Sequence, residues 1–355
     1  MDIEKSENEK KLEKTNKRKC LLCVAAIFIV LFTSVLAFLV FHKSGKKTGE
    51  GIVLRLSEVH SDEYPTSLAD KEFSRLVYER SGGRIKVEVY TDGRLFSDEP
   101  DALAALQAGE LDFARISSAP ICKFVPVLNV VNLPFLYRDD AHFLNVITGP
   151  IGQIFLDSIE KENVGIVGLC FYDSGSRSLY MKKEIHSVEE LEGMKIRIQV
   201  SPTMNDYLLS CNATGIIGIA THEVYDKILN GIVDGAENNI PTYQTMGDYL
   251  AAPYYIKTNH ARVPDILVAS SSLFEKLPES DVELIKECAM ETELFQIKRW
   301  AEKEEKSAEI ISKAANVVEL TDEELSGFRE KAKGVYKQYE AEFGDLIEMI
   351  KNEEP

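Results

Sequence analysis

Hydrophobic and polar residues alternate with two different periods in the first half of the chain. IVLRLSEV, RIKVEVY, LDFARI and VGIVGLCFY are short apolar segments bounded by turn residues, which is typical of β-strands. Between them, residues 65–80, 101–108 and 141–160 have apolar side chains at helical spacing. Strand and helix therefore alternate, and this order predicts an α/β fold with a mostly parallel sheet.

The alternation continues beyond residue 172 and changes near the C-terminus. A capping box at Ser187 opens a short helix, and residues 202–211 are again helical in pattern. After the segment PYYIKTNH and the apolar strand DILVAS, one long helix is predicted over residues 280–316. A second long helix is predicted from the capping box at Thr321 to near Ile350.

The segment GMKIRIQV, residues 193–200, alternates strictly and reads as a strand. Its three apolar residues point to one face, whereas Lys195, Arg197 and Gln199 point to the other. An arginine in such a position either lies in water or receives a negatively charged group.

The first fifty residues differ from the rest of the chain. Residues 20–41 form an apolar block of 22 residues without a charge, long enough to cross a bilayer of about 30 Å as a helix. Basic residues are more numerous before the block than after it, which predicts a cytoplasmic N-terminus and an extracytoplasmic remainder. We therefore expect a basic head over residues 1–19, an uncleaved single-pass anchor over 20–42 and a linker over 43–50, with a cleaved signal as the alternative.

The net charge of the chain bears on the kind of ligand that it can bind, and the positions of its cysteines bear on disulfide formation. Residues 1–50 hold ten Lys or Arg against six Asp or Glu, so of the total formal charge of −17, residues 51–355 carry −21. This balance disfavours nucleic-acid binding, and an anionic ligand would need local cations. Cys20 and Cys23 lie in the apolar block, and the sequence does not pair the other four cysteines, which are Cys122, Cys170, Cys211 and Cys288.

Enzyme motifs are absent or incomplete. HEVYD at residues 222–226 has Asp226 where a zinc motif needs its second histidine, and no phosphate-binding loop or nucleophile elbow occurs. Asp234 and Glu237 could be imagined as an acid/base pair, but their spacing is more typical of turn and cap groups. We expect no enzyme activity, no cofactor and no metal.

Three arginines occupy strand ends or loop starts. Arg115 lies in DFARISSAP, Arg177 follows an apolar strand, and Arg197 lies on a polar strand face. Ligands in open α/β sheets bind beyond the carboxyl ends of strands, and a guanidinium can hold a carboxylate through two parallel hydrogen bonds. A solvated or surface-paired side chain is the alternative for each of the three.

Several longer blocks resemble one family. They are FSRLVYERSGGRIKVEVYTDGRL, AGELDFARISSAP, NLPFLYRDDAHF, GSRSLYMKKEIHSVEELEGMKIRIQ, EVYDKILNGIVDGAENN and YYIKTNH. In this order, over about residues 53–339, they resemble the solute-binding proteins of TRAP transporters, the tripartite ATP-independent periplasmic class. The resemblance implies a two-lobed clamshell of two α/β lobes, joined by hinge strands and braced by the long helix. Lobe I would comprise residues 51–172 and 258–355, and lobe II residues 173–257.

The resemblance also implies an organic acid held between the lobes. Arg197 maps to the family's main carboxylate partner, Arg177 to a second cationic contact and Asn238 to the asparagine after DGAE. RISSAP, FYDSGSRS and DGAENNIPTY resemble the branch that binds sugar acids such as hexuronates. Residues that could bind hydroxyl groups are Glu58, His60, Asp173, Gln199, Asn238 and Asn239, and Tyr64, Tyr172 or Tyr243 could cover a sugar ring or pack in the core. The family's glycine is replaced by Phe96, and no contact is assigned to Asp98 or Glu99.

The expected partners are a small organic acid, the membrane subunits of a TRAP permease and the membrane itself through the N-terminal helix. The alternative is a sensor lobe for a C4-dicarboxylate or a 2-oxo acid, which would act with a separate signalling partner. An enzyme is the third possibility.

Overall fold

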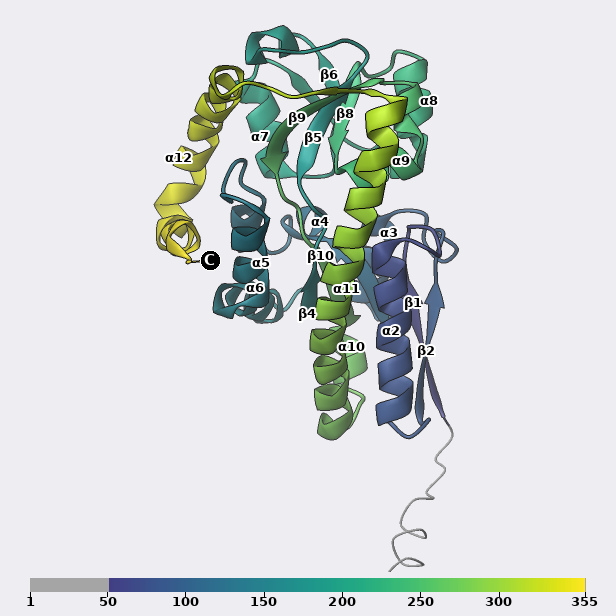
Figure 1. The fold of residues 1–355 in the computed structure, drawn as a ribbon. Coiled ribbons are helices and arrows are strands. Elements are labelled where there is room, and N and C mark those ends of the chain that lie inside the picture. Colours follow the sequence, from purple (N-terminus) through teal and green to yellow (C-terminus); the bar gives the residue numbers. More distant parts are fainter. Residues whose placement is uncertain (1–50, 355) are drawn as a thin grey trace, which may run out of the picture. The chain divides into compact units, whose positions relative to one another are not determined.

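The computed structural model describes residues 51–354, which fold around two β-sheets (Figure 1). The first sheet has the strand order β2-β1-β3-β10-β4. Its strands are β1 (Ile52–Ser57), β2 (Ile85–Tyr90), β3 (Phe113–Ser117), β4 (Ile166–Tyr172) and β10 (Asp265–Ser270). β1 is parallel to β2 and β3, whereas β10 is antiparallel to both β3 and β4.

Helices cover both faces of the first sheet. On one face, α2 (Pro65–Arg80) and α11 (Glu279–Ala314) bury apolar residues such as Phe73 and Ile285 against the strands. On the other face lie α3 (Glu99–Ala108), α5 (Asp140–Thr148) and α6 (Pro150–Lys161), which contribute Leu103, Phe143 and Phe155 to the core. The short elements of this lobe are α4 (Ser118–Ile121), η1 (Pro126–Asn132) and α10 (Ser271–Phe274).

The second sheet has the strand order β11-β9-β5-β8-β6-β7. Its strands are β5 (Arg177–Met181), β6 (Lys195–Arg197), β7 (Thr214–Ile216), β8 (Gly235–Asn238), β9 (Tyr254–Ala261) and β11 (Asn316–Val318). Its helices are η2 (Val188–Leu191), α7 (Pro202–Ser210), η3 (Thr221–Glu223), α8 (Val224–Leu229), α9 (Ile240–Thr245) and η4 (Asp248–Leu250). The C-terminal helix α12 (Asp322–Asn352) packs on α7 and η1.

The chain crosses between the two sheets three times, through the short connections from β4 to β5 and from β9 back to β10, and then through α11 to β11. Helix α11 contacts α2 and β4 of the first lobe and α9 of the second, so it braces both lobes (Figure 1). The expectation of two α/β lobes with a long bracing helix is confirmed.

Three details of the predicted fold are wrong. Both sheets are mixed instead of mostly parallel. In the first sheet, β10 follows the return connection and runs antiparallel between β3 and β4, and in the second sheet β5 runs antiparallel to β8 and β9. The helix predicted over residues 141–160 is two helices, since Pro150 cannot continue the hydrogen-bond ladder and Gly149 is extended. The strand in GMKIRIQV ends at Arg197.

The second sheet extends beyond residues 173–257, the range predicted for lobe II. It includes β9, which ends at Ala261, and also β11. β11 joins this sheet because it pairs in parallel with β9 after α11 has passed both lobes.

The predicted basic head, anchor and linker lie outside the described residues. Within residues 51–354, no helix has the length and apolar character needed to cross a membrane. Cys122, Cys170, Cys211 and Cys288 are all buried as free thiols, and no disulfide joins them.

Candidate functional site

A cavity of about 240 Å³ lies between the two lobes. In the first lobe, the cavity wall is formed by the segment after β1 and by the segment that leads into α3, together with the first residues of α3. The end of β3 and the start of β10 complete this wall. The second-lobe wall comes from the segments after β6 and β7, from the end of β8 and from α9. Of the predicted site residues, the cavity wall includes Arg197, Arg177, Asn238, Arg115, His60, Gln199 and Asn239.

Arg197 is the last residue of β6 and is 4% exposed. Its Nε and Nη2 donate to the carbonyl oxygen of Ile219 at 3.0 and 2.8 Å, whereas Nη1 has no hydrogen-bond partner. No carboxylate of residues 51–354 forms an ion pair with it, and burial lowers its pKa. A buried cation without a counter-ion is costly, so this position favours an incoming anion.

Arg177, at the start of β5, is neutralised by Glu237. Its Nε lies 2.5 Å from Glu237 Oε2, and its Nη2 donates to Glu237 Oε1 at 2.9 Å. Burial alone would raise the pKa of Glu237, but Arg177 and His260 outweigh it and hold that pKa at about 2. Arg177 Nη1 also donates to Asn238 Oδ1 at 2.8 Å, which holds the Asn238 side chain at the cavity wall.

Arg115 lies in β3 and is surrounded by three carboxylates. Its Nη2 and Nε donate to Glu58 at 2.7 and 3.1 Å, and its Nη1 is shared between Glu99 and Asp265, with 3.3 Å to Asp265 Oδ1. We call Arg115, Glu58, Glu99 and Asp265 the Arg115 cluster. Glu99 and Asp265 line the cavity, whereas Glu58 lies behind them, fully buried.

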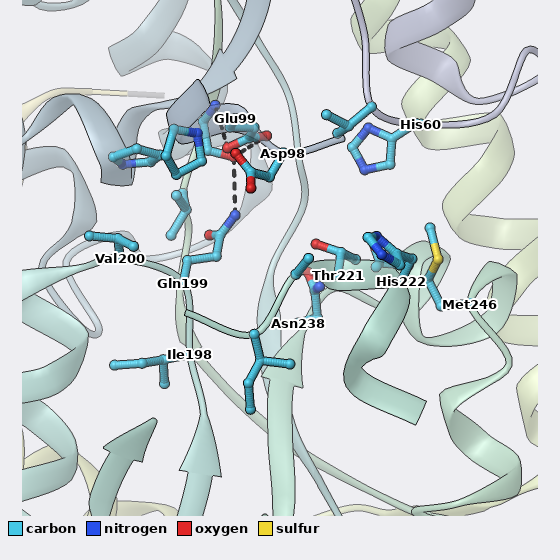
Figure 2. A pocket seen from close by; sticks show the side chains of 18 of the residues that line it. His60, Asp98, Glu99, Ile198, Gln199, Val200, Thr221, His222, Asn238 and Met246 are labelled. Carbon is cyan, nitrogen blue, oxygen red and sulfur yellow. Dashed lines mark hydrogen bonds between the residues drawn. The ribbon is translucent and has the colours of Figure 1, made fainter. Parts of the chain in front are cut away.

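His60 contacts both the Arg115 cluster and the aromatic ring of Tyr64. Its Nδ1 lies 2.9 Å from Glu58 Oε1, and its ring stacks on Tyr64 with centroids 4.1 Å apart. Figure 2 shows the imidazole at the cavity, on the side opposite Asn238.

Two hydrogen bonds join the lobes across the cavity. Tyr64 and Thr242 connect through their hydroxyl groups at 3.0 Å. Gln199 Nε2 donates to Ser117 Oγ at 3.2 Å, and Figure 2 shows this side chain reaching from the second lobe towards Asp98 and Glu99. Gln199 Oε1 remains buried without a partner.

Three predicted residues do not line the cavity. The Glu58 carboxylate is fully buried and is hydrogen-bonded to Arg115 and His60. Asp173 Oδ1 accepts from the Gly175 amide at 2.8 Å in the hinge segment, and burial raises its pKa to about 6. Tyr243 is fully buried and donates to the Ala252 carbonyl at 2.7 Å, so core packing explains it.

Asn239 lines the cavity, but its side chain caps α9 by accepting from the Thr242 amide.

The structure also brings residues into the wall that the sequence did not indicate. They include Glu99, Asp265, Ser117, Thr221, His222 and Met246 (Figure 2 labels Glu99, Thr221, His222 and Met246). The sequence carries only a weak signal for a binding role of these residues. Asp265 has the pattern of the first residue of a buried strand, and Glu99 that of an acidic residue in the first turn of a helix.

Two α/β lobes with two connecting segments and a polar cavity between them define a two-lobed solute-binding protein. The family model described as bacterial extracellular solute-binding protein, family 7, matches residues 56–342. The chain therefore belongs to this family, the solute-binding proteins of TRAP transporters, which bind solutes outside the cytoplasm and are not enzymes.

Individual relatives are similar over nearly the whole described region. A solute-binding protein of Chromohalobacter salexigens is 31% identical over 341 residues, 95% of this chain and 97% of the relative. A TRAP solute-binding protein of Sulfitobacter sp. NAS-14.1, solved with bound β-D-galacturonate, is 33% identical with a TM-score of 0.79 over 85% of this chain and 100% of that chain. Another from Pseudomonas putida F1, solved with bound D-glucuronate, is 30% identical with a TM-score of 0.82 over 86% and 98%.

Proposed function

We propose that this protein captures a hexuronate and delivers it to the membrane subunits of a TRAP permease. The observation that carries the proposal is Arg197, a buried guanidinium at the cavity whose charge has no carboxylate partner within residues 51–354 and whose Nη1 has no hydrogen bond. The ligand carboxylate would supply both the counter-ion and the acceptor. A charge-assisted bond of this kind is stronger than a neutral one.

The rest of the wall supports a polyhydroxylated ligand. Gln199 Oε1 is an unused acceptor, the Asn238 amide nitrogen is an available donor, and His60 and Thr221 add polar groups from opposite sides of the cavity. The galacturonate and glucuronate bound by relatives combine one carboxylate with several hydroxyl groups. In this proposal Arg177 positions Asn238 instead of contacting the carboxylate itself, because Glu237 already neutralises it.

We also propose that the predicted anchor at residues 20–42 holds the receptor at the membrane surface, near the permease.

Calorimetric titration of the purified protein tests the proposal. D-Glucuronate or D-galacturonate should bind with one site per chain, whereas D-glucose and D-galactose, which lack the carboxylate, should not. Arg197→Met keeps most of the side-chain volume and should weaken uronate binding by about a hundredfold or more, because a buried charge pair is lost. Equal binding of the uronates by wild type and variant would rule out the assignment of Arg197.

A further inference from the structure

The two walls of the cavity have opposite electrostatic character. On the second lobe, Arg197 presents a cation that forms no ion pair with a carboxylate of residues 51–354. Burial lowers its pKa, although the nearby carboxylates of Glu237 and Asp248 act to raise it. On the first lobe, the Arg115 cluster sets three carboxylates against one guanidinium. A ligand that spans the cavity therefore meets a cation at one end and an excess of carboxylate at the other.

The Arg115 guanidinium cannot serve a second acidic group of a ligand. Each of its three nitrogens already donates to a carboxylate, Nε and Nη2 to Glu58 and Nη1 to Glu99 and Asp265. The Arg115 side chain is 1% exposed, so water screens its bonds to the three carboxylates only weakly. This wall offers acceptors: Glu99 and Asp265 both line the cavity, and Asp265 Oδ2 takes part in no hydrogen bond with residues 51–354.

We propose that the Arg115 cluster makes the site selective for acids with a single carboxylate, with Glu99 and Asp265 as the specificity-determining residues. The inference rests on the proposed function, in which Arg197 holds the first carboxylate. Carboxylate acceptors at the other end suit the hydroxyl donors of a sugar. A second carboxylate there would face the carboxylates of Glu99 and Asp265, and such a contact between like charges discriminates by repulsion.

A matched pair of ligands isolates this effect. D-Gluconate and D-glucarate share the same open carbon chain and differ at one end, which is CH2OH in the first and a carboxylate in the second. We expect D-glucarate to bind at least about a hundredfold more weakly than the tighter of D-gluconate and D-glucuronate in calorimetric titrations.

Two variants test which residues exclude the diacid. Glu99→Gln and Asp265→Asn each remove one negative charge and leave Arg115 paired with the other two carboxylates, so the fold should be preserved. Each should reduce the preference for the monoacid over D-glucarate by about tenfold. Glu192→Gln is the control and should leave the preference unchanged, because Glu192 is an exposed carboxylate of the second lobe that does not line the cavity.

The outcomes separate this inference from the proposed function. The inference would be overturned, even if D-glucuronate binds, if wild type prefers the monoacid over D-glucarate by less than about tenfold. Tight binding of D-glucarate or succinate would also overturn it. An unchanged preference in both cluster variants would also overturn the roles of Glu99 and Asp265. If D-gluconate binds in strong preference to D-glucarate while both uronates fail, selectivity for one carboxylate stands and the hexuronate assignment fails.

Discussion

At the scale of single residues, the three cavity arginines differ in their partners although they look alike in the sequence. Arg115 and Arg177 each have a buried carboxylate within hydrogen-bond distance, whereas Arg197 has only the Ile219 carbonyl. Period-2 alternation correctly separated Arg197 from the apolar face of its strand. Nothing in the local sequence distinguishes a paired arginine from an unpaired one, because the partners lie 57 and 60 residues away.

This difference predicts effects of different size for the same substitution. Arg177→Met leaves Glu237 buried without its guanidinium and should lower the free energy of unfolding by about 3–5 kcal/mol. Arg197→Met removes a buried cation that has no ion pair and should change the free energy of unfolding by about 1 kcal/mol or less. Denaturant unfolding of both variants without ligand measures the contrast, and equal destabilisation would contradict it.

At the scale of elements, the hinge segment between β4 and β5 is held by one face of α11. Glu293 accepts from the Phe171 amide at 3.1 Å, and Gln296 exchanges two hydrogen bonds with the backbone of Asp173. Burial raises the pKa of Glu293 and of Glu304 to about 7 and that of Asp173 to about 6. The sequence predicted α11 well, but not which of its many acids face the hinge.

These raised pKa values predict a pH dependence of stability. Between the unfolded and folded pKa values, the folded state holds protons that the unfolded state has lost, so the free energy of unfolding should fall as pH rises from about 5 to about 8. Glu293→Gln keeps the acceptor for Phe171 and removes the titration. The variant should show a shallower slope and should be more stable than wild type by about 2 kcal/mol at pH 8.

Glu283→Gln, at an exposed position of the same helix, is the control and should leave the slope unchanged. An unchanged slope in Glu293→Gln would mean that this carboxyl does not titrate in the folded protein above its ordinary range.

At the scale of the folded unit, the cavity is bounded by both lobes, and few direct bonds join them across it. The Tyr64 to Thr242 hydrogen bond links the segment after β1 to α9, and a bond of this kind contributes about 1 kcal/mol. Because the bond forms only when the lobes are together, its loss should appear in ligand affinity through the closure equilibrium.

Tyr64→Phe and Thr242→Val should therefore each weaken uronate binding about fivefold, and the double variant should bind no more weakly than either single one. Tyr137→Phe is the control, because its hydroxyl donates to the Val131 carbonyl at 3.0 Å within the first lobe, and affinity should not change. Fully additive losses in the double variant would mean that the two hydroxyls act on binding separately.

The sequence by itself determined most of the longer elements and the family. Helix α2 lies over the predicted residues 65–80, α12 begins at the predicted capping box, and the family resemblance is confirmed over residues 56–342. These features are local or linear: caps, breakers and periodic apolar positions act within a few residues, and blocks of similar sequence keep their order along the chain.

Only the tertiary structure decided which charges meet. Glu58, Glu99 and Asp265 come from three separate segments and converge on Arg115, while Asp173 and Tyr243 are held in the hinge and the core. The direction of β10 and the placement of β11 in the second sheet follow from how the chain crosses between lobes. Ion pairing depends on distances of a few ångström in space, and spacing along the chain does not fix these distances until both lobes have folded.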